Sequence, residues 1–317
     1  MPENVGRDLA HIVVLAVLVL VLLVVLTKFQ WIHCSQVPGW CNIYCGTITR
    51  SSSQVAMLFG PEGDGIGNPT GLGSLENKIR GIRPDLAFVP LPVQDLGAGV
   101  LKRFDVVILE RAKTLTTLQV RVLLDYVKAG GTLVMVGDSA TVQTIDPFDL
   151  LQAKRQESLF FQRLGDALVM RNATTDSAYY NQSVEAWKKT EAFDILNSSN
   201  TTRYGFRQMV DVVAAEYNRT EIRPRGDYAN LTIARPDHLV SKGLQYTLNN
   251  TQIQEYAVVQ ANPSRADILA FIQDGDFRYP GIIETRFAGK VLYFAFPPEY
   301  VNSNTLLANT FDYIAAC

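Results

Sequence analysis

The sequence predicts an α/β fold, with a mainly parallel sheet and helices on both of its faces. Short apolar runs closed by glycine or proline are typical of buried strands, and they alternate along the chain with longer amphipathic runs that are typical of helices. Such alternation favours a parallel sheet, because each parallel strand pair needs a crossover connection. The chain has 317 residues, of which 47% are hydrophobic, so it is long enough to bury this core.

The sequence of residues 54–136 predicts four strands and two helices. Gly60 and Pro61 close the first apolar run, and a glycine-rich stretch then leads into the first helix. Gly130 and Gly131 end the second helix, because glycine is favoured just past a helix C-terminus. The strands are expected at 54–59, 86–90, 104–109 and 132–136, and the helices at 74–80 and 114–128.

The middle of the chain has a different character. Charged and aromatic residues accumulate between 151 and 227 and no strong strand pattern is present, so we expect an inserted, glycosylated subdomain there. It would interrupt an α/β domain formed by 54–150 and 228–317. Further strands are expected at 256–259, 268–272, 281–285 and 291–296, with a tight turn at 274–276 and a closing helix at 304–316.

An apolar segment near the N-terminus predicts a membrane anchor. Residues 9–27 carry no charge, and about 19 residues at 1.5 Å per residue span the roughly 30 Å hydrocarbon layer of a bilayer. A cleaved signal peptide would have a shorter apolar region and a small-x-small cleavage site after it, and this sequence has neither. We therefore expect a cytoplasmic tail at 1–8, one transmembrane helix at 9–27 and a linker at 28–53.

Seven glycosylation sequons predict the orientation of the chain. They place serine or threonine two residues after Asn172, Asn181, Asn197, Asn200, Asn218, Asn230 and Asn249. The charges that flank the apolar segment, Arg7 and Lys28, do not decide the orientation. Since N-glycosylation takes place outside the cytoplasm, we expect a cytoplasmic N-terminus and an extracellular body at the cell membrane.

Four cysteines, an even number, predict two disulfide bonds in an oxidising compartment. They are Cys34, Cys41, Cys45 and Cys317. Three pairings are open, and we favour one that ties Cys317 back to the segment after the anchor. The alternative is a zinc site that combines His33 with the first three cysteines, but their spacings do not reproduce the paired Cys-x-x-Cys pattern of zinc knuckles.

Four stretches of the body resemble one known superfamily. They are residues 104–109, 123–134, 236–244 and 289–294. Together they resemble the class I glutamine-amidotransferase-like superfamily, in the branch of trehalose-utilisation-type and related extracytoplasmic proteins, over residues 54–150 and 230–317. The resemblance implies a flavodoxin-like fold. In active members it also implies a nucleophilic cysteine on the turn after the fourth strand, with a histidine and an acid nearby.

The turn after the fourth strand, residues 136–140, contains no cysteine, so the resemblance implies a degenerate member. Ser139 is the candidate replacement nucleophile, with His238 as its base. Asp138 and Glu62 are the acids of the same neighbourhood. The alternative is that Asp138 and Ser139 cap the segment that follows, and that His238 is a hydrogen-bonded loop residue.

The loop after the first strand offers oxygen atoms to a cation. Glu62, Asp64 and Asn68 are candidate calcium ligands, although their spacing is not that of an EF-hand. The glycines of this loop do not follow the Gly-x-Gly-x-x-Gly pattern of nucleotide sites, and we expect no cofactor. The net charge of −2 and the absence of a block rich in lysine or arginine exclude nucleic acid as a partner.

These observations predict a non-enzymatic, N-glycosylated ectodomain, held in the membrane by residues 9–27, that binds a partner protein or glycan at the cell surface. The first alternative is a membrane-tethered hydrolase or amidase-like enzyme, which contact between Ser139 and His238 would favour. The second is an accessory subunit of a membrane complex, which an apolar, sequon-free patch on the body would favour. A short anchor on a degenerate domain of this kind favours an archaeal cell surface.

Overall fold

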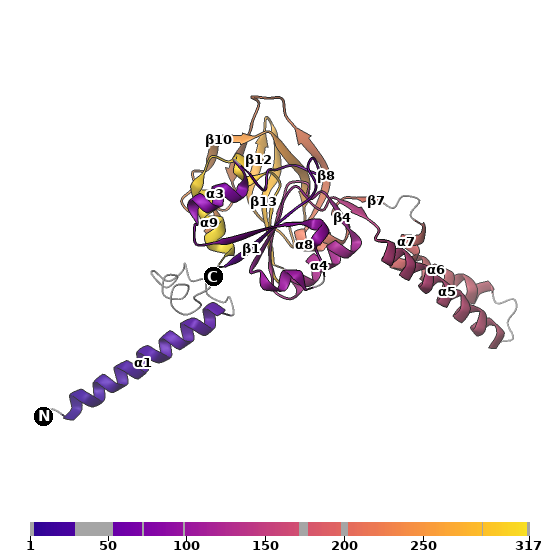
Figure 1. Cartoon of the computed structure of the whole chain (residues 1–317), viewed down its shortest axis with the longest axis horizontal. Coiled ribbons are helices and arrows are strands. Elements are labelled where there is room, and N and C mark those ends of the chain that lie inside the picture. Colours follow the sequence, from indigo (N-terminus) through magenta and orange to yellow (C-terminus); the bar gives the residue numbers. More distant parts are fainter. Residues whose placement is uncertain are drawn as a thin grey trace.

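The computed structural model describes residues 3–28, 53–71, 73–97, 99–170, 177–197, 202–286 and 288–315 (Figure 1). All four cysteines lie outside the described residues, as do His33 and the sequon residues Asn172 and Asn200. The predictions of disulfide bonds, of a zinc site and of glycosylation at these two asparagines therefore stay predictions.

A central sheet forms the body of the protein. Its strands are β1 (Gln54–Phe59), β2 (Ala87–Pro92), β3 (Val106–Leu109), β5 (Thr132–Val136), β9 (Ala229–Ile233), β10 (Thr247–Ile253), β12 (Asp267–Asp274), β13 (Phe277–Arg286) and β14 (Lys290–Phe294). Within the described residues their order is β10-β9-β12-β13-β14-β5-β3-β1-β2. The strands from β14 to β2 run parallel, and those from β13 to β10 continue the sheet antiparallel. The predicted α/β class and the parallel sheet from β14 to β2 are confirmed, and the antiparallel strands from β13 to β10 extend that sheet.

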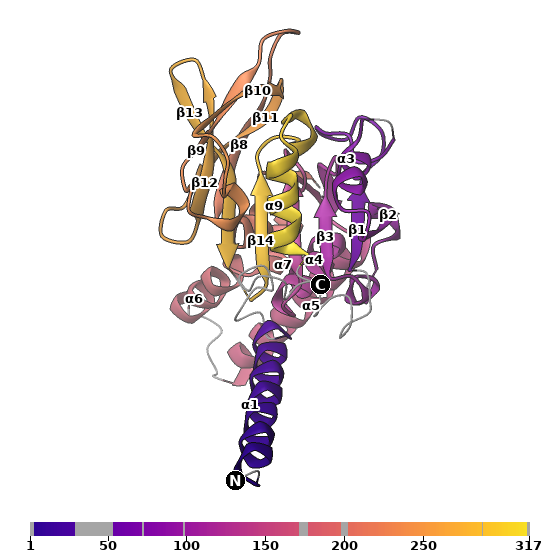
Figure 2. The ribbon, with the colours of Figure 1, turned by 90° about the vertical axis from the view of Figure 1, so that its left-hand side faces the viewer.

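Helices cover both faces of the sheet, as the sequence predicts. They are α3 (Leu75–Ile82) and α9 (Asn304–Ile314), which pack together on one face, and α4 (Thr117–Lys128) on the other (Figures 1 and 2). The helix expected at 114–128 begins only at Thr117. Residues 114–116 form the short strand β4 instead, because Thr116 caps α4. Its hydroxyl accepts from Gln119 N (3.2 Å), and Gln119 Oε1 accepts from Thr116 N (2.8 Å).

Two smaller sheets flank the central one within the part of the chain that is described. The first consists of β4 (Thr114–Thr116), β6 (Val142–Thr144) and β7 (Thr202–Tyr204), and the second of β8 (Ala215–Ile222) and β11 (Glu255–Ala261). The strand expected at 256–259 is present as β11, but it pairs with β8 and not with the central sheet. β8 lies within 151–227, where no strand was expected, because most of its side chains are exposed or half-buried and form no apolar run.

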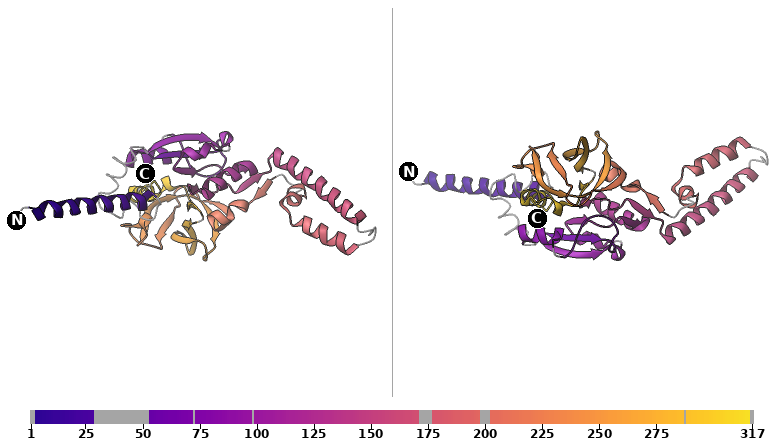
Figure 3. Two further views of the ribbon diagram at one scale, coloured as in Figure 1. Left: turned by 90° about the horizontal axis from the view of Figure 1, so that it is seen from below. Right: turned by 90° about the horizontal axis from the view of Figure 1, so that it is seen from above.

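A helical arm projects from the sheet domain (Figures 1 and 3). It consists of α5 (Pro147–Met170), α6 (Ser177–Lys188) and α7 (Glu191–Asn197), which we call the arm. The arm has a small core of its own, in which Ala153, Trp187 and Ile195 are buried together. The ring of Phe160 stacks on Trp187, with 4.9 Å between the ring centroids. The arm is therefore a packed unit and not an irregular loop.

The N-terminal helix α1 runs from Glu3 to Lys28 (Figure 2). Its side chains from Ile12 to Leu22 are apolar and exposed. In the part of the chain that the structure describes, no helix combines the length and the apolar character of a membrane span. Short helical turns complete the fold: η3 (Val93–Asp95), η4 (Val100–Arg103), η5 (Arg207–Met209), α8 (Val210–Val213), η6 (Leu239–Ser241) and η7 (Pro298–Tyr300).

Candidate functional site

The carboxyl ends of the parallel strands meet at one edge of the sheet, which is where open α/β sheets bind their ligands. The loop of residues 60–74 follows β1 at this edge, and two buried glutamates hold it. Glu110 directly follows β3, and Glu299 lies in η7, after β14. The backbone N–H of Asn68 donates to Oε1 of both, at 3.1 Å from Glu110 and 2.8 Å from Glu299. We call Glu110 and Glu299 the carboxyl pair.

The carboxyl pair is buried, and the pKa of both groups is raised. Glu110 is fully buried and Glu299 is 3% exposed, and the Oε2 atom of each has no partner outside the pair. Burial raises the pKa of Glu110 well above its ordinary value, and the adjacent Glu299 raises it further. Burial also raises the pKa of Glu299. One carboxyl group can therefore stay protonated and donate to the other.

Asp138, at the end of β5, ties three segments of the chain together. The residue is 1% exposed. Its Oδ1 accepts from Ile66 N (2.9 Å) in the loop after β1, and its Oδ2 accepts from Thr220 Oγ1 (3.2 Å) in β8. Lys113 Nζ, from the segment after β3, lies 3.2 Å from the same Oδ2. The Asp138 carboxylate thus holds the loop after β1, the segment after β3 and strand β8 together at this edge of the sheet.

Ser139, the candidate nucleophile, is buried in the turn after β5. Only 1% of the residue is exposed, and its Oγ accepts from Ala112 N at a long distance of 3.4 Å. The loop packs tightly on the turn, since a Cβ atom on Gly137 would lie 2.3 Å from Ile66 Cγ1. The Ser139 hydroxyl is therefore not accessible to a substrate in this arrangement.

His238, the candidate base, lies elsewhere in the fold and has its own partners. Its Nδ1 accepts from Val240 N (3.3 Å), which makes it the N-cap of η6. Its Nε2 lies 2.9 Å from Glu284 Oε2 in β13, and the hydroxyl of Tyr313 in α9 donates to the other oxygen of Glu284. The structure therefore places Asp138 next to Ser139, but it does not join His238 to them.

The candidate calcium ligands are used within the protein or turned to solvent. Glu62 is exposed. The carboxylate of Asp64 accepts from the backbone N–H (2.9 Å) and the hydroxyl (2.8 Å) of Thr114. Asn68 takes part through its backbone, since its N–H donates to the carboxyl pair and its carbonyl oxygen accepts from Leu75 N (3.0 Å). Among the described residues, no three histidine, cysteine, aspartate or glutamate side chains are grouped to hold a metal ion. Asp64 thus fastens the loop to the start of β4.

The sequon asparagines that the structure describes lie at different places. Asn181 and Asn197 are exposed on the arm, and Asn218 is exposed on β8. Asn230 is half-buried in β9, and Asn249 belongs to β10. The arm therefore carries accessible acceptor sites, as a glycosylated segment would.

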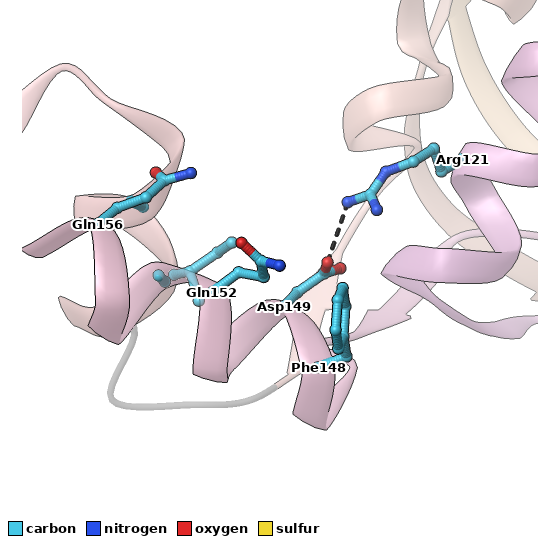
Figure 4. A pocket seen from close by; sticks show the side chains of 8 residues that line it. Arg121, Phe148, Asp149, Gln152 and Gln156 are labelled. Carbon is cyan, nitrogen blue, oxygen red and sulfur yellow. Dashed lines mark hydrogen bonds and ion pairs between the residues drawn. The ribbon is translucent and has the colours of Figure 1, made fainter.

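An open pocket lies at the base of the arm, between α4, α5 and α7 (Figure 4). Its volume is about 270 Å³. This is just below the range of roughly 300 to 1,000 Å³ that is usual for small-molecule pockets. It is lined by Arg121, Phe148, Asp149, Gln152, Ala153, Gln156, Ala192 and Ile195.

The polar groups of this pocket converge from two helices. Arg121 of α4 reaches across to Asp149 of α5, with 3.0 Å between Nη2 and Oδ1 (Figure 4). The hydroxyl of Thr117 donates to the other oxygen of Asp149. The Arg121 side chain is 49% exposed, so its further N–H groups are open to a ligand. Gln152 and Gln156 stand one turn apart on α5 and add two exposed amides.

None of these residues was predicted from the sequence. Arg121 lies in the helix expected at 114–128, whereas Asp149 lies in no predicted helix or strand, and nothing in the pattern pairs them. The spacing of Gln152 and Gln156 is the one available signal, because residues four apart share a helix face.

A second cavity, of about 480 Å³, lies beside β12 and β13. It is lined by Asp211, Pro263, Ser264, Arg265, Ala266, Asp267, Glu284 and Thr285. Its charged groups have partners in the protein: Arg265 Nη1 lies 2.5 Å from Asp211 Oδ1, and Glu284 binds His238. The charges of the pocket at the base of the arm are also paired, but that pocket adds two exposed glutamine amides and the exposed ring of Phe148, so we take it as the candidate binding site.

Known proteins that are similar to this chain support its fold, but they do not show its family or its function. No protein-family model and no curated protein matches the sequence. A ThuA-like protein from Bacteroides uniformis is similar in structure, with a TM-score of 0.50 at 10% identity over 83% of this chain and 91% of that one. This chain shares its fold. The predicted resemblance to trehalose-utilisation-type proteins is thus supported at the level of the fold.

Other solved structures are similar over a comparable part of this chain. A ThuA-like protein from Parabacteroides merdae has a TM-score of 0.45 at 10% identity, over 84% of this chain and 90% of that one. A β-galactosidase from Rahnella sp. R3 has a TM-score of 0.49 at 16% identity, over 84% of this chain but 31% of that one. The chain therefore spans about a third of the length of that β-galactosidase.

Proposed function

We propose that this chain is a membrane-anchored, N-glycosylated ectodomain that binds a neutral glycan at the base of its arm and catalyses no reaction. The pocket between α4 and α5 carries the proposal, because its polar groups converge on one open space (Figure 4). The proposal combines this binding site with a location of the protein body outside the cytoplasm.

The lining of the pocket suits a ligand with many hydroxyl groups. A hydroxyl group both donates and accepts hydrogen bonds, and so does each amide of Gln152 and Gln156. The charges of Arg121 and Asp149 cancel, so the pocket gives no strong preference to an anion or a cation. Phe148, 58% exposed, adds an apolar ring against which the carbon face of a sugar can pack. A neutral sugar unit satisfies all of these groups together.

The edge of the sheet supports a binding role without catalysis. The turn of residues 136–140 lacks a cysteine, and Ser139 is buried. His238 pairs with Glu284 and not with Ser139. Acyl-transfer chemistry needs a nucleophile within hydrogen-bond reach of its base, so the hydrolase alternative has no support from these contacts.

The membrane anchor is supported by the sequence and by the exposure of α1. Eleven consecutive residues from Ile12 to Leu22 are apolar and exposed, so α1 has no polar stripe that would face water in a soluble domain. The part of α1 whose side chains are described, residues 11–26, is by itself shorter than a membrane span. The apolar run of the sequence, residues 9–27, extends past both of its ends.

Replacing both Gln152 and Gln156 by alanine is expected to weaken glycan binding by roughly tenfold or more, because each lost hydrogen bond contributes about 0.5 to 1.5 kcal/mol. The measurement is a titration of the detergent-solubilised chain with neutral oligosaccharides selected on an array that also contains acidic ones. Replacing Gln260 by alanine is the control, because it is an exposed glutamine of β11 outside the pocket. Binding of acidic glycans alone, or equal affinity of all variants, would contradict the proposal.

The proposed location outside the cytoplasm predicts that the protein carries glycans and disulfide bonds. The chain purified from its native membrane should lose mass on enzymatic deglycosylation, and reduction with alkylation should reveal two disulfide bonds. Replacing Asn181 by glutamine should remove the mass of one glycan, because this asparagine is exposed on α6. Unmodified asparagines together with four free thiols would place the body in the cytoplasm and refute this part of the proposal.

A further inference from the structure

The outer face of α5 carries a continuous exposed stripe. Its members are Leu151, Arg155, Leu159, Gln162, Asp166 and Met170, which we call the α5 stripe, and all of them are exposed. They are separated by three or four residues, the spacing that keeps side chains on one face of a helix. Three of the six are large apolar residues: Leu151 is 65% exposed, Leu159 is 42% and Met170 is 87%.

The rest of the arm does not need this stripe for its own packing. The opposite face of α5 already supplies Ala153 and Leu164, which are buried, and Phe160 stacks on Trp187 of α6. The stripe is therefore an exposed face of mixed apolar and polar residues on a helix whose opposite face is already packed. Apolar side chains interleaved with polar ones are typical of reversible contacts between proteins.

The stripe is symmetric about its own midpoint. Its successive spacings are four, four, three, four and four residues, so they read the same in both directions. An antiparallel copy of α5, with a two-fold axis crossing the helix between positions 160 and 161, places each member of the stripe opposite another member. The facing pairs are Leu151 with Met170, Arg155 with Asp166, and Leu159 with Gln162. A two-fold contact requires such a self-complementary surface.

The charges of the stripe favour this arrangement. Arg155 of one copy faces Asp166 of the other, and the symmetry forms the pair twice. In a parallel arrangement Arg155 would face another Arg155, which is repulsive. Among the described residues neither Arg155 nor Asp166 forms an ion pair within its own chain, so both are available.

The sequons of the arm lie outside the helix that carries the stripe. Asn181 lies in α6 and Asn197 in α7, while Asn172 and Asn200 lie in the segments next to these helices in the sequence. No sequon falls within α5 itself. Glycans on the arm would therefore grow from other segments than the one that carries the stripe.

We propose that two copies of this chain associate through antiparallel α5 stripes, with the Arg155–Asp166 pairs fixing the register. The contact involves one helix from each copy, so the dimer is weak and reversible in solution. It goes beyond the proposed glycan binding and does not depend on it. The pocket at the base of the arm lies beside the stripe, so a dimer carries two such pockets.

Charge reversal tests the register directly. The full glycosylated chain is studied in detergent by sedimentation across a range of concentrations. Arg155→Glu should weaken self-association by roughly tenfold or more, because the introduced carboxylate would face Asp166, and Asp166→Arg should do the same. An equimolar mixture of the two variants should dimerise again, since each reversed residue then faces its opposite charge. The chain with both substitutions should also dimerise alone.

Lys154→Glu is the matched control, because Lys154 is an exposed cation of α5 outside the stripe. It should leave self-association unchanged. A chain that stays monomeric at every concentration would overturn the proposal, and so would a dimer that is insensitive to both single reversals. Loss of the dimer in both single variants without recovery in the mixture would overturn the register and therefore the proposal. Circular dichroism of each variant confirms that the arm still folds.

Discussion

Replacing Asp138 by alanine is expected to destabilise the protein by about 2 to 4 kcal/mol. The substitution leaves the buried N–H of Ile66 without its acceptor and removes the partner of the Lys113 ammonium group. Lys113 is 36% exposed, so water can take over part of that lost interaction, and the estimate is reduced accordingly. The larger part of the loss comes from the loop after β1, which Asp138 holds from beneath.

The free energy of unfolding is measured by urea denaturation followed by far-ultraviolet circular dichroism. Asp138→Asn should cost less than the alanine variant, because the amide oxygen still accepts from Ile66 N. Asp237→Ala is the matched control: the Asp237 side chain is 75% exposed and lies 3.6 Å from Arg235, so its loss should change stability by less than about 0.5 kcal/mol. If Asp138→Ala is as stable as this control, Asp138 does not hold the loop after β1 in place.

The central strands could be predicted from the sequence because both of their faces are covered. The buried residues of β1, β3 and β5 form nearly continuous apolar runs. Such runs are typical of strands that are covered by helices on both faces. The expected tight turn at 274–276 is confirmed as well, since β12 ends at Asp274 and β13 begins at Phe277. Gly275 has a φ of 57° there, a conformation that glycine adopts easily.

The direction and partners of the later strands could not be predicted. An apolar run shows that a strand is buried, but it does not show whether its neighbour runs parallel or antiparallel. β12 and β13 therefore read as further strands of a parallel sheet, although they pair antiparallel. β8 escaped detection for a different reason, because it has exposed or half-buried residues at most positions and its partner β11 lies far along the chain.

The carboxyl pair of the candidate site could not be predicted from the sequence either. Glu110 and Glu299 come from distant parts of the sequence, and only the fold brings both to the N–H of Asn68. One signal was present: Glu110 directly follows a predicted buried strand, where an acid would lie at the ligand-binding edge of an α/β sheet. For Glu299 the sequence offers no comparable signal, because it sits in a short turn after Pro297 and Pro298.

The carboxyl pair predicts that stability falls as the pH rises. Burial and the adjacent carboxyl raise the pKa of Glu110 in the folded protein, and burial raises that of Glu299, above the ordinary value of 4.5. Below this pH both states hold the protons and the contribution of the pair is complete. Above it the unfolded chain releases protons that the folded chain retains, so the contribution is lost as the pH approaches the raised pKa.

Replacing Glu110 by glutamine should make this loss smaller. Glutamine keeps an oxygen that accepts from Asn68 N, and its amide N–H can donate to Glu299 as the protonated acid does. The free energy of unfolding of the variant, measured at each pH, should therefore fall less than that of the unmodified protein as the pH rises above 4.5. Glu62→Gln, at an exposed glutamate of the same loop, should follow the unmodified protein throughout. Identical pH profiles for Glu110→Gln and the unmodified chain would mean that no proton is retained by the pair, and that the loop is held by two ordinary carboxylates.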